Sequence, residues 1–462
     1  MASADSLKGL MKWLSRDEWR QPFNELFERH VGLPCERAGI AVDEMADKIG
    51  NQNASVMWGC IFEDFLAYDL DDGRNIVDDY LKRRGWRESV PNKRYMTALR
   101  SSAMSLYEVS DIVRDQSFLA RDLLRGGEPV RISEKSATHS LKQWDRLAAR
   151  VVRMGPRVEM AGGVLAFSRE CSERLRELFA SFSKEMLSEA RESAKRAGAD
   201  VDPLDFDSEA LRHAGFLFTN VWLDDALQRV LNPRQPVMRN SDGDDIAFTT
   251  VRYRLKEARD RAALEAALMA MPNLQLTGDN LWTWTEAEAP ATGKPTAADH
   301  VITSTFSDGS VSLGSVALEA ETLLLETNSP QRAQRGLALL EPVIRPFVGE
   351  PVVASKTMAE MQASPPASDG RKPSTGLSAE EERAVIQEML ERHYHALLDQ
   401  PVPMLGDVSP RKAAKTKTGR EKLVDWLKLI ENSNARQEAH SAMATYDLGW
   451  MWEELGIAHL RR

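Results

Sequence analysis

Cysteine is scarce in this sequence, with Cys35, Cys60 and Cys171 the only three among 462 residues. They are odd in number, lie far apart and include no Cys-x-x-Cys pair. This scarcity argues against a disulfide-stapled scaffold and against a structural zinc site built from cysteines. It is typical of a reducing compartment, so the sequence predicts a cytoplasmic protein that holds no metal or other cofactor.

Long apolar runs are also missing. No stretch reaches the roughly 20 apolar residues that a membrane-spanning helix needs. Residues 1–14 contain Asp5 and no long apolar core, so we expect no secretory signal peptide and no membrane partner. Positive charge is in deficit as well: 60 Lys and Arg face 70 Asp and Glu, a formal net charge of -10 that argues against a general polyanion binder.

What the sequence does contain is enough hydrophobic residues, 42%, to fill several cores. A chain of 462 residues is expected to form about two to four domains. The patterns predict a multidomain α+β protein that is mainly helical, with a small β-barrel-like module, a central α/β unit and a helical C-terminal domain. We expect a helical region over 1–104, the β-rich module over 105–168, helices plus the α/β unit over 169–355, a linker over 356–377 and the C-terminal domain over 378–462.

The module at 105–168 is predicted from a change of period. Apolar residues alternate with polar ones at Val130 and Ile132, after a Gly126-Gly127 turn, and residues 158–167 form a hairpin pattern around a second Gly-Gly pair. Short strands with turns between them indicate a small barrel. Arg150 and Arg153 are expected on its solvated edge.

The sequence of this module resembles a segment of bacterial SEC-C-motif proteins. The resemblance lies in SLYEV, RDLLRGGEPVRISEK, WDRLAARVV and GGVLAF. Those proteins end in a zinc hook of closely spaced cysteines and a histidine. This sequence contains no such hook, so the resemblance implies no metal here.

Two acidic clusters, Asp69–Asp72 and Asp200–Asp207, supply the oxygen ligands that divalent cations prefer. They suggest an alternative function, that of a metal-dependent hydrolase or nuclease. A solvated turn explains the first cluster and a favourable helix N-terminus explains the second. In the central unit, Asn328-Ser329-Pro330 predicts a capped helix whose Arg332 and Arg335 could form an anion site, with ordinary capping the simpler interpretation. Trp282 and Trp284 are expected in the core of that unit.

The stretch from Pro401 to Glu431 carries the functional prediction. Gly406 closes a turn, Ser409-Pro410 predicts a capped helix start, and Gly419-Arg420 opens a second helix. In that second helix an apolar face is formed by side chains at helical spacing: Leu423, Trp426, Leu427 and Ile430.

The pattern Pro-x-Pro-x-Leu-Gly-x-x-Ser-Pro, followed by Gly-Arg and Trp-Leu, resembles the toxin-binding domain of Xre/MbcA/ParS-type antitoxins over about 35 residues. Asp407 stands where that pattern has a second glycine. Members of the family bind and block a partner toxin, often one that consumes NAD. The resemblance implies that the C-terminal domain binds a protein partner, with a toxin as one such partner.

The same stretch is locally basic in an acidic protein. The residues predicted to bind the partner are Leu405, Gly406, Ser409, Pro410, Arg411, Lys412, Lys415, Gly419 and Arg420. A solvated face and a nucleic-acid contact are the competing interpretations of its cations. The sequence thus favours a non-enzymatic interaction protein without catalytic residues, with the metal-dependent enzyme and a nucleic-acid-binding adaptor as alternatives.

Overall fold

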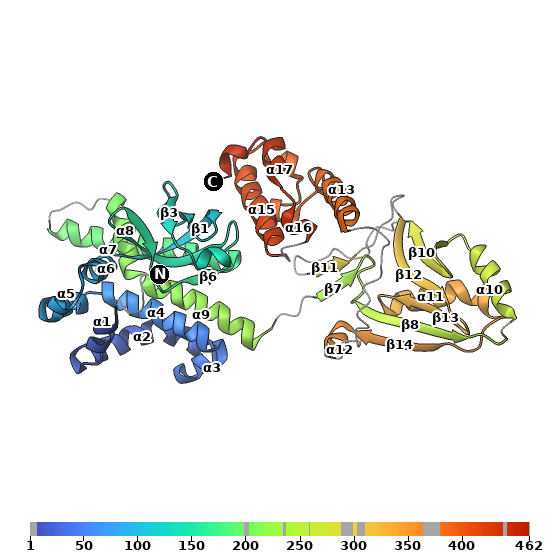
Figure 1. Cartoon of the computed structure of the whole chain (residues 1–462), viewed down its shortest axis with the longest axis horizontal. Helices are drawn as coiled ribbons and strands as arrows, with labels where there is room; N and C mark the ends of the chain where they lie inside the picture. The colour runs from blue at the N-terminus through green and yellow to red at the C-terminus, as the bar shows by residue number, and fades with distance from the viewer. Residues whose placement is uncertain are drawn as a thin grey trace. The chain divides into compact units, whose positions relative to one another are not determined.

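The computed structural model describes residues 7–197, 203–233, 237–257, 259–287, 299–302, 310–363, 379–437 and 441–461 (Figure 1). Contacts divide the chain into two compact units. The first combines Met1–Pro233 with Ser378–Arg462, and the second is Arg234–Leu377. The predicted fold class, α+β with a barrel-like module and C-terminal helices, is confirmed.

The first unit begins with six helices, whose bounds are α1 Lys8–Leu14, α2 Asp17–Ala38, α3 Met45–Ile49, α4 Asn51–Ala67, α5 Ile76–Arg84 and α6 Val90–Arg100. Their positions follow the helical spacing of apolar residues, and α4 is the most buried because Met57, Ile61 and Phe65 all lie in the core. Asn75 caps α5, since its side-chain oxygen accepts from the backbone N–H of Val77 at 2.8 Å.

Six antiparallel strands form the small barrel, with bounds β1 Met104–Val113, β2 Ser117–Asp122, β3 Val130–Ser133, β4 Arg146–Met154, β5 Arg157–Met160 and β6 Leu165–Phe167. The strand order is β3-β2-β1-β4-β5, and β6 pairs with β4. Strands β3 and β5, at the two ends of this order, contact each other, so the sheet is nearly closed. Val109, Phe118 and Ile132 fill its interior. The predicted barrel-like module is therefore present.

One residue of the barrel contradicts the prediction made for it. Arg150, expected on a solvated edge, has no exposed surface and forms an ion pair with Asp64 of α4. Its guanidinium also donates to the backbone oxygen of Ser102 at 2.6 Å. The alternation of β4 places this cation on the face that the N-terminal helices cover, where a buried carboxylate stabilises it. Arg153 is exposed, as expected.

Three helices, α7 Arg169–Ala197, α8 Pro203–His213 and α9 Gly215–Leu231, follow the barrel. Helix α9 packs against α2 and α7, so it closes the core that the N-terminal helices begin. Of the acidic cluster predicted at 200–207, residues 200–202 lie outside the described residues, and the rest belong to the first turns of α8.

The second unit is an antiparallel sheet in the order β14-β8-β13-β12-β10-β9. Its strands are β8 Ala247–Arg254, β9 Leu274–Gly278, β10 Leu281–Ala287, β12 Ser310–Leu318, β13 Thr322–Thr327 and β14 Val352–Thr357. Helix α11, Pro330–Ile344, packs on β8, β12 and β13, and α10, Asp260–Met269, packs on α11. Two short strands, β7 Val237–Asn240 and β11 Asp299–Ile302, pair in parallel.

Trp282 and Trp284 lie buried in the core of this sheet, as expected. The linker predicted over 356–377 begins too early, because β14 continues to Thr357 and is followed by helix α12, Met358–Ala363. The remainder of that linker lies outside the described residues.

The C-terminal helices complete the first unit. They are α13 Ala379–Leu397, α14 Pro410–Ala413, α15 Lys417–Ala435, α16 Ala442–Thr445 and α17 Gly449–Glu454, with single 3-10 turns η5 at Pro403–Leu405 and η6 at Ala458–Leu460. Leu423, Leu427, Met451 and Trp452 form their core, so α17 packs on α15. No helix in the described part of the chain combines the length and apolar character needed to span a bilayer.

Candidate functional site

The predicted partner-binding stretch folds as a turn followed by two helices. Gly406 adopts a left-handed conformation with φ of 82°, and Asp407 follows it with φ of 57°. The backbone N–H of Val402 donates to the oxygen of Val408 at 3.1 Å and closes the turn. Leu405 points into the core beneath it. Glycine suits position 406 because it adopts positive φ without steric cost.

Four more of the predicted binding residues shape this turn and the helix junction. Leu405, Ser409 and Pro410 are buried, and Ser409 occupies the cap position of α14 without making a side-chain capping bond. At Gly419 a Cβ atom would lie 2.1 Å from the backbone oxygen of Ala413, so only glycine lets the two helices meet this closely. Helix α15 begins two residues before Gly419 because Thr416 caps it. These residues therefore shape the backbone of the turn and the helix junction.

The predicted cations divide into paired and exposed ones. Arg411 forms ion pairs with Asp399, at 3.2 Å, and with Glu454. Arg420 is half-buried and donates to the backbone oxygen of Ala414 at 3.0 Å. Lys412 and Lys415 are exposed, and neither forms an ion pair within the described residues.

Three further residues of the same stretch are exposed. The side chains of Met404 and Val408 are 42% and 38% exposed on either side of the Gly406 turn. The Nζ of Lys422 lies beside Gly406. We call the exposed set Met404, Val408, Lys412, Lys415 and Lys422 the basic corner.

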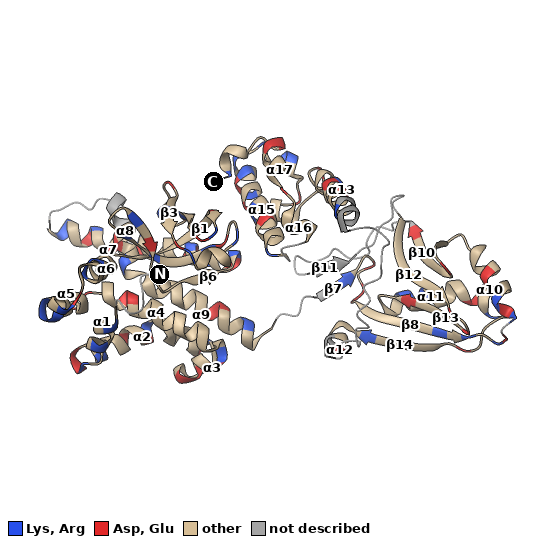
Figure 2. Ribbon diagram, in the orientation of Figure 1, with Lys and Arg blue, Asp and Glu red and all other residues tan. Residues whose placement is uncertain are grey.

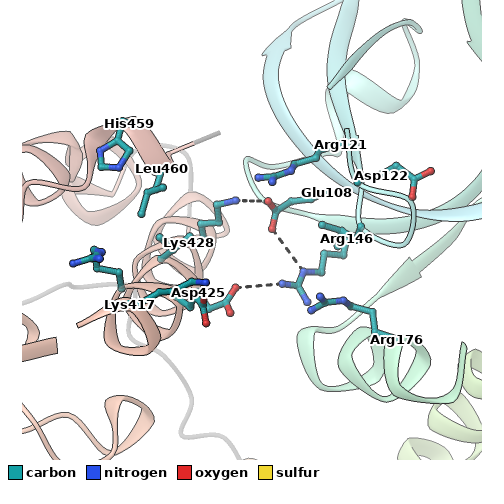
Figure 3. A pocket seen from close by; sticks show the side chains of 15 residues that line it. Glu108, Arg121, Asp122, Arg146, Arg176, Lys417, Asp425, Lys428, His459 and Leu460 are labelled. Atoms are coloured by element: carbon teal, nitrogen blue, oxygen red, sulfur yellow. Dashed lines mark hydrogen bonds and ion pairs between the residues drawn. The ribbon is translucent and has the colours of Figure 1, made fainter. Parts of the chain in front are cut away.

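The opposite side of α15 packs on the barrel. Lys428 and Glu108 of β1, each only 3% exposed, form an ion pair (Figure 3). One turn further along α15, the side-chain amide of Asn432 donates to Asp145 at 2.7 Å, and Arg436 pairs with the same carboxylate at 2.6 Å. We call this contact of α15 with the barrel the seam. A buried ion pair is stable only with such good geometry and additional hydrogen bonds.

Trp144 anchors the seam from the barrel side. It adopts a positive φ of 66° and is buried, and its indole N–H donates to Glu431 of α15. The same carboxylate accepts from the indole of Trp452 at 2.7 Å, while Lys428 Nζ lies 4.1 Å from the centre of the Trp144 ring. A cation over an indole face adds to the attraction. Sequence patterns did not reveal the seam, because its partners come from distant parts of the chain.

A pocket of about 700 Å³ opens at this seam (Figure 3). It lies between α15 and η6 on one side and β1, β2, β4 and α7 on the other. Its cationic lining residues are Arg121, Arg146, Arg176, Lys417, Arg420 and Lys428. Its anionic lining residues are Glu108, Asp122, Glu421 and Asp425. We call it the seam pocket.

The cations of the seam pocket crowd one another. Arg146 forms ion pairs with Glu173 at 2.6 Å and with Asp425 at 3.6 Å, and Arg169 reaches the same Asp425 at 3.3 Å. Burial lowers the pKa of Lys428, and nearby arginines lower it further, against the opposing effect of Glu108. Burial and the charge of Arg146 likewise lower the pKa of Arg169. The pocket therefore holds positive charge at some electrostatic cost.

The acidic turn proposed as a metal ligand set is engaged otherwise. Asp69 pairs with Arg100, and Asp72 pairs with Arg74 at 2.7 Å. Among the described residues, no three His, Cys, Asp or Glu side chains converge as metal ligands would. Arg332 is also internal: its backbone N–H is capped by Ser329 at 3.0 Å. Its guanidinium pairs with Asp242 at 2.9 Å, so ordinary capping describes this helix.

Two further basic features were missed by sequence reasoning. Trp86, between α5 and α6, is 72% exposed and sits in the run Arg83-Arg84-Gly85-Trp86-Arg87. Figure 2 shows Lys and Arg in blue along α5. The guanidinium of Arg87 lies 4.7 Å from the centre of its ring. A groove of about 610 Å³ between α6 and β4 carries Lys93, Arg94 and Arg153 and no carboxylate in its lining. The sequence signal that could have indicated the first of these features is an aromatic residue within a run of cationic residues.

The fold and these surfaces together describe an α+β protein built around a small barrel, with its C-terminal helices packed on that barrel. Residues 55–199, from α4 through α7, match a protein family described only as a family of unknown function (DUF7986). No curated protein matches the chain.

Proposed function

We propose that this chain is a non-enzymatic interaction protein of the cytoplasm whose C-terminal domain binds an acidic protein partner through the basic corner. The observation that carries the proposal is that Lys412, Lys415 and Lys422 are exposed in the same stretch of chain as the exposed apolar side chains of Met404 and Val408. Exposed cations together with exposed apolar side chains suit a partner that presents an apolar residue among carboxylates.

The resemblance to the antitoxin toxin-binding domain supports a toxin as that partner. The residues that carry it, Leu405, Gly406, Ser409, Pro410 and Gly419, form the turn and the helix junction of the corner. They hold the corner in one conformation, which reduces the entropy lost when a partner binds. Seam contacts at Lys428 and Glu431 add to this, because they fix α15 on the barrel.

The test is a capture experiment with the full chain as bait. The variant carrying Lys412→Glu and Lys415→Glu reverses two exposed charges, and we expect its affinity for the captured protein to fall about tenfold or more, roughly 1.4 kcal/mol, at low salt. A matched control reverses Lys184 and Lys195, two exposed lysines of α7. Equal capture by all three baits, or capture by none, contradicts the proposal.

A growth assay tests whether the partner is a toxin. If the partner is a toxin, its expression alone should arrest growth, and co-expression of the wild-type chain should restore it. Co-expression of the Lys412→Glu and Lys415→Glu variant should restore growth poorly. A captured protein that is harmless when expressed alone leaves the partner-binding proposal standing but refutes the toxin.

The surface around Trp86 favours a second candidate function, binding of single-stranded nucleic acid. An exposed indole offers a base a stacking surface, and Arg87, Lys93, Arg94 and Arg153 can neutralise phosphates. Trp86→Ala should weaken binding of a single-stranded oligonucleotide by about 1–3 kcal/mol. A gel-shift series across salt concentrations measures this, and an affinity that is unchanged by the substitution contradicts it.

A further inference from the structure

The seam pocket is positively charged although the chain as a whole is acidic. Six cationic side chains line it against four anionic ones, whereas the complete sequence has ten more acidic than basic residues. Lys428 and Arg146 lie buried at its base with Glu108 between them (Figure 3). Arg176 and Lys417 stand on opposite sides, one on α7 and the other on α15.

The start of α15 adds to this field. Lys417, Arg420, Val424 and Lys428 fall on successive turns of the helix, so the pocket follows α15 from its first residue. The unpaired backbone N–H groups and the macrodipole make the first turn of a helix partially positive. Anions are therefore favoured at the end of the pocket where Lys417 lies.

Buried hydrogen-bond donors at the seam also lack acceptors. The Nε of Arg146, which is 5% exposed, forms an ion pair with Glu108 at 3.7 Å but has no hydrogen-bond partner within the described structure, and neither does the Nη2 of Arg169. Arg146 lines the pocket, and Arg169 pairs with Asp425, which also lines it. Buried polar groups normally form hydrogen bonds, so a guanidinium nitrogen without one beside an open cavity can still donate to an anion there.

We propose that the seam pocket binds a small phosphorylated molecule of about nucleotide size. Phosphate oxygens accept charge-assisted hydrogen bonds from guanidinium and ammonium groups, which the exposed lining residues Arg176 and Lys417 can donate. A volume of about 700 Å³ holds such a molecule with room to spare. Leu123, Val424 and Leu460 provide apolar surface for its uncharged part.

A ligand in this position touches both sides of the seam. It would neutralise repulsion among cations that come from the barrel, from α7 and from α15. Binding to the docked arrangement alone stabilises that arrangement by mass action. The ligand therefore strengthens the attachment of the C-terminal helices to the barrel.

Calorimetric titration of the full chain with pyrophosphate and with ADP tests the proposal. We expect saturable binding of at least one probe, weakened at least tenfold by Arg176→Glu combined with Lys417→Glu. Both residues have exposed side chains, and the two single substitutions serve if the double variant does not fold. Absence of saturable binding to the wild type, or equal binding to the charge-reversed variants, overturns the proposal.

The basic corner supplies the matched control. Lys412→Glu with Lys415→Glu changes the net charge by the same amount at residues outside the pocket lining, so phosphate binding should be retained. Conversely, Arg176→Glu with Lys417→Glu should leave capture of the protein partner intact. The two proposals can thus fail separately. Equal loss of probe binding in both double variants would show that only the net charge of the protein matters, and it would overturn the proposed binding site.

Discussion

At the scale of single residues, two adjacent carboxylates of α4 show how surroundings decide ionisation. Burial opposes the charged form of Asp64, but Arg150 and His30 outweigh burial and hold the pKa of Asp64 below its usual value. Glu63 is equally buried and receives the backbone N–H of Gly163 at 3.0 Å, while its second oxygen has no hydrogen-bond partner among the described residues. Burial therefore raises the pKa of Glu63 to about 7.

The raised pKa of Glu63 predicts a pH dependence of stability. Its folded pKa of about 7 lies above the ordinary 4.5, so the folded state holds the proton more tightly. The resulting stabilisation is full below about pH 4.5 and is lost as the pH rises through 7. At roughly 1.4 kcal/mol per pKa unit, the loss is about 3–4 kcal/mol.

Glu63→Gln removes this titration and keeps the side-chain shape. We expect the free energy of unfolding of the variant to exceed that of the wild type more at pH 8 than at pH 5. Denaturant unfolding at a series of pH values measures the difference between the two chains, in which other titrating groups cancel. A difference that does not vary with pH would show that Glu63 stays ionised throughout.

At the scale of elements, the attachment of α15 to the barrel depends on the buried pair of Lys428 and Glu108. Removal of either partner leaves the other charge buried without compensation, at a cost of about 3–5 kcal/mol. Replacement of both by apolar residues, Lys428→Met with Glu108→Leu, should cost less than the sum of the single changes. We expect a coupling energy above about 1 kcal/mol, measured by hydrogen exchange of the α15 amides.

The exposed pair Arg20–Asp17 of α2 provides the control for this cycle. Its side chains are 65% and 91% exposed at a separation of 2.9 Å, so solvent screens them. The same double-mutant cycle should return less than about 1 kcal/mol. Equal coupling energies for the two pairs would mean that burial at the seam contributes nothing.

The elements were predictable to the extent that their signals are local. Helix α4 and the barrel strands follow from apolar spacing, and the turn at Gly406 follows from its residue types. Lys428 illustrates the limit, because it lies between Leu427 and Leu429 and its buried partner is 320 positions earlier in the chain. Arg150 was misjudged for the same reason, since the carboxylate that stabilises it belongs to another element.

The candidate site was predictable in part. The pattern around Leu405 and Ser409 located a corner, but it did not separate the buried residues that shape the corner from the exposed lysines that border it. Trp86 was overlooked because exposure depends on what the folded chain leaves uncovered. The seam pocket required the whole fold, since its lining comes from segments more than 300 positions apart.

At the scale of the whole molecule, helix α15 contributes residues to two different surfaces. Its Lys428 side packs on the barrel, while Lys422 belongs to the basic corner. The first compact unit therefore combines the barrel and the C-terminal helices, although more than 140 residues separate them in sequence. Fragments that contain only residues 378–462 lose the seam, so interaction experiments should use the full chain.

The most direct test of the central claim is hydrogen exchange of the full chain with and without its captured protein partner. The account predicts that slowed exchange concentrates over residues 402–424, where the basic corner lies, and that Lys412→Glu with Lys415→Glu abolishes it. Protection confined to other segments, such as α5 and α6 around Trp86, would contradict the claim that the C-terminal corner binds the partner.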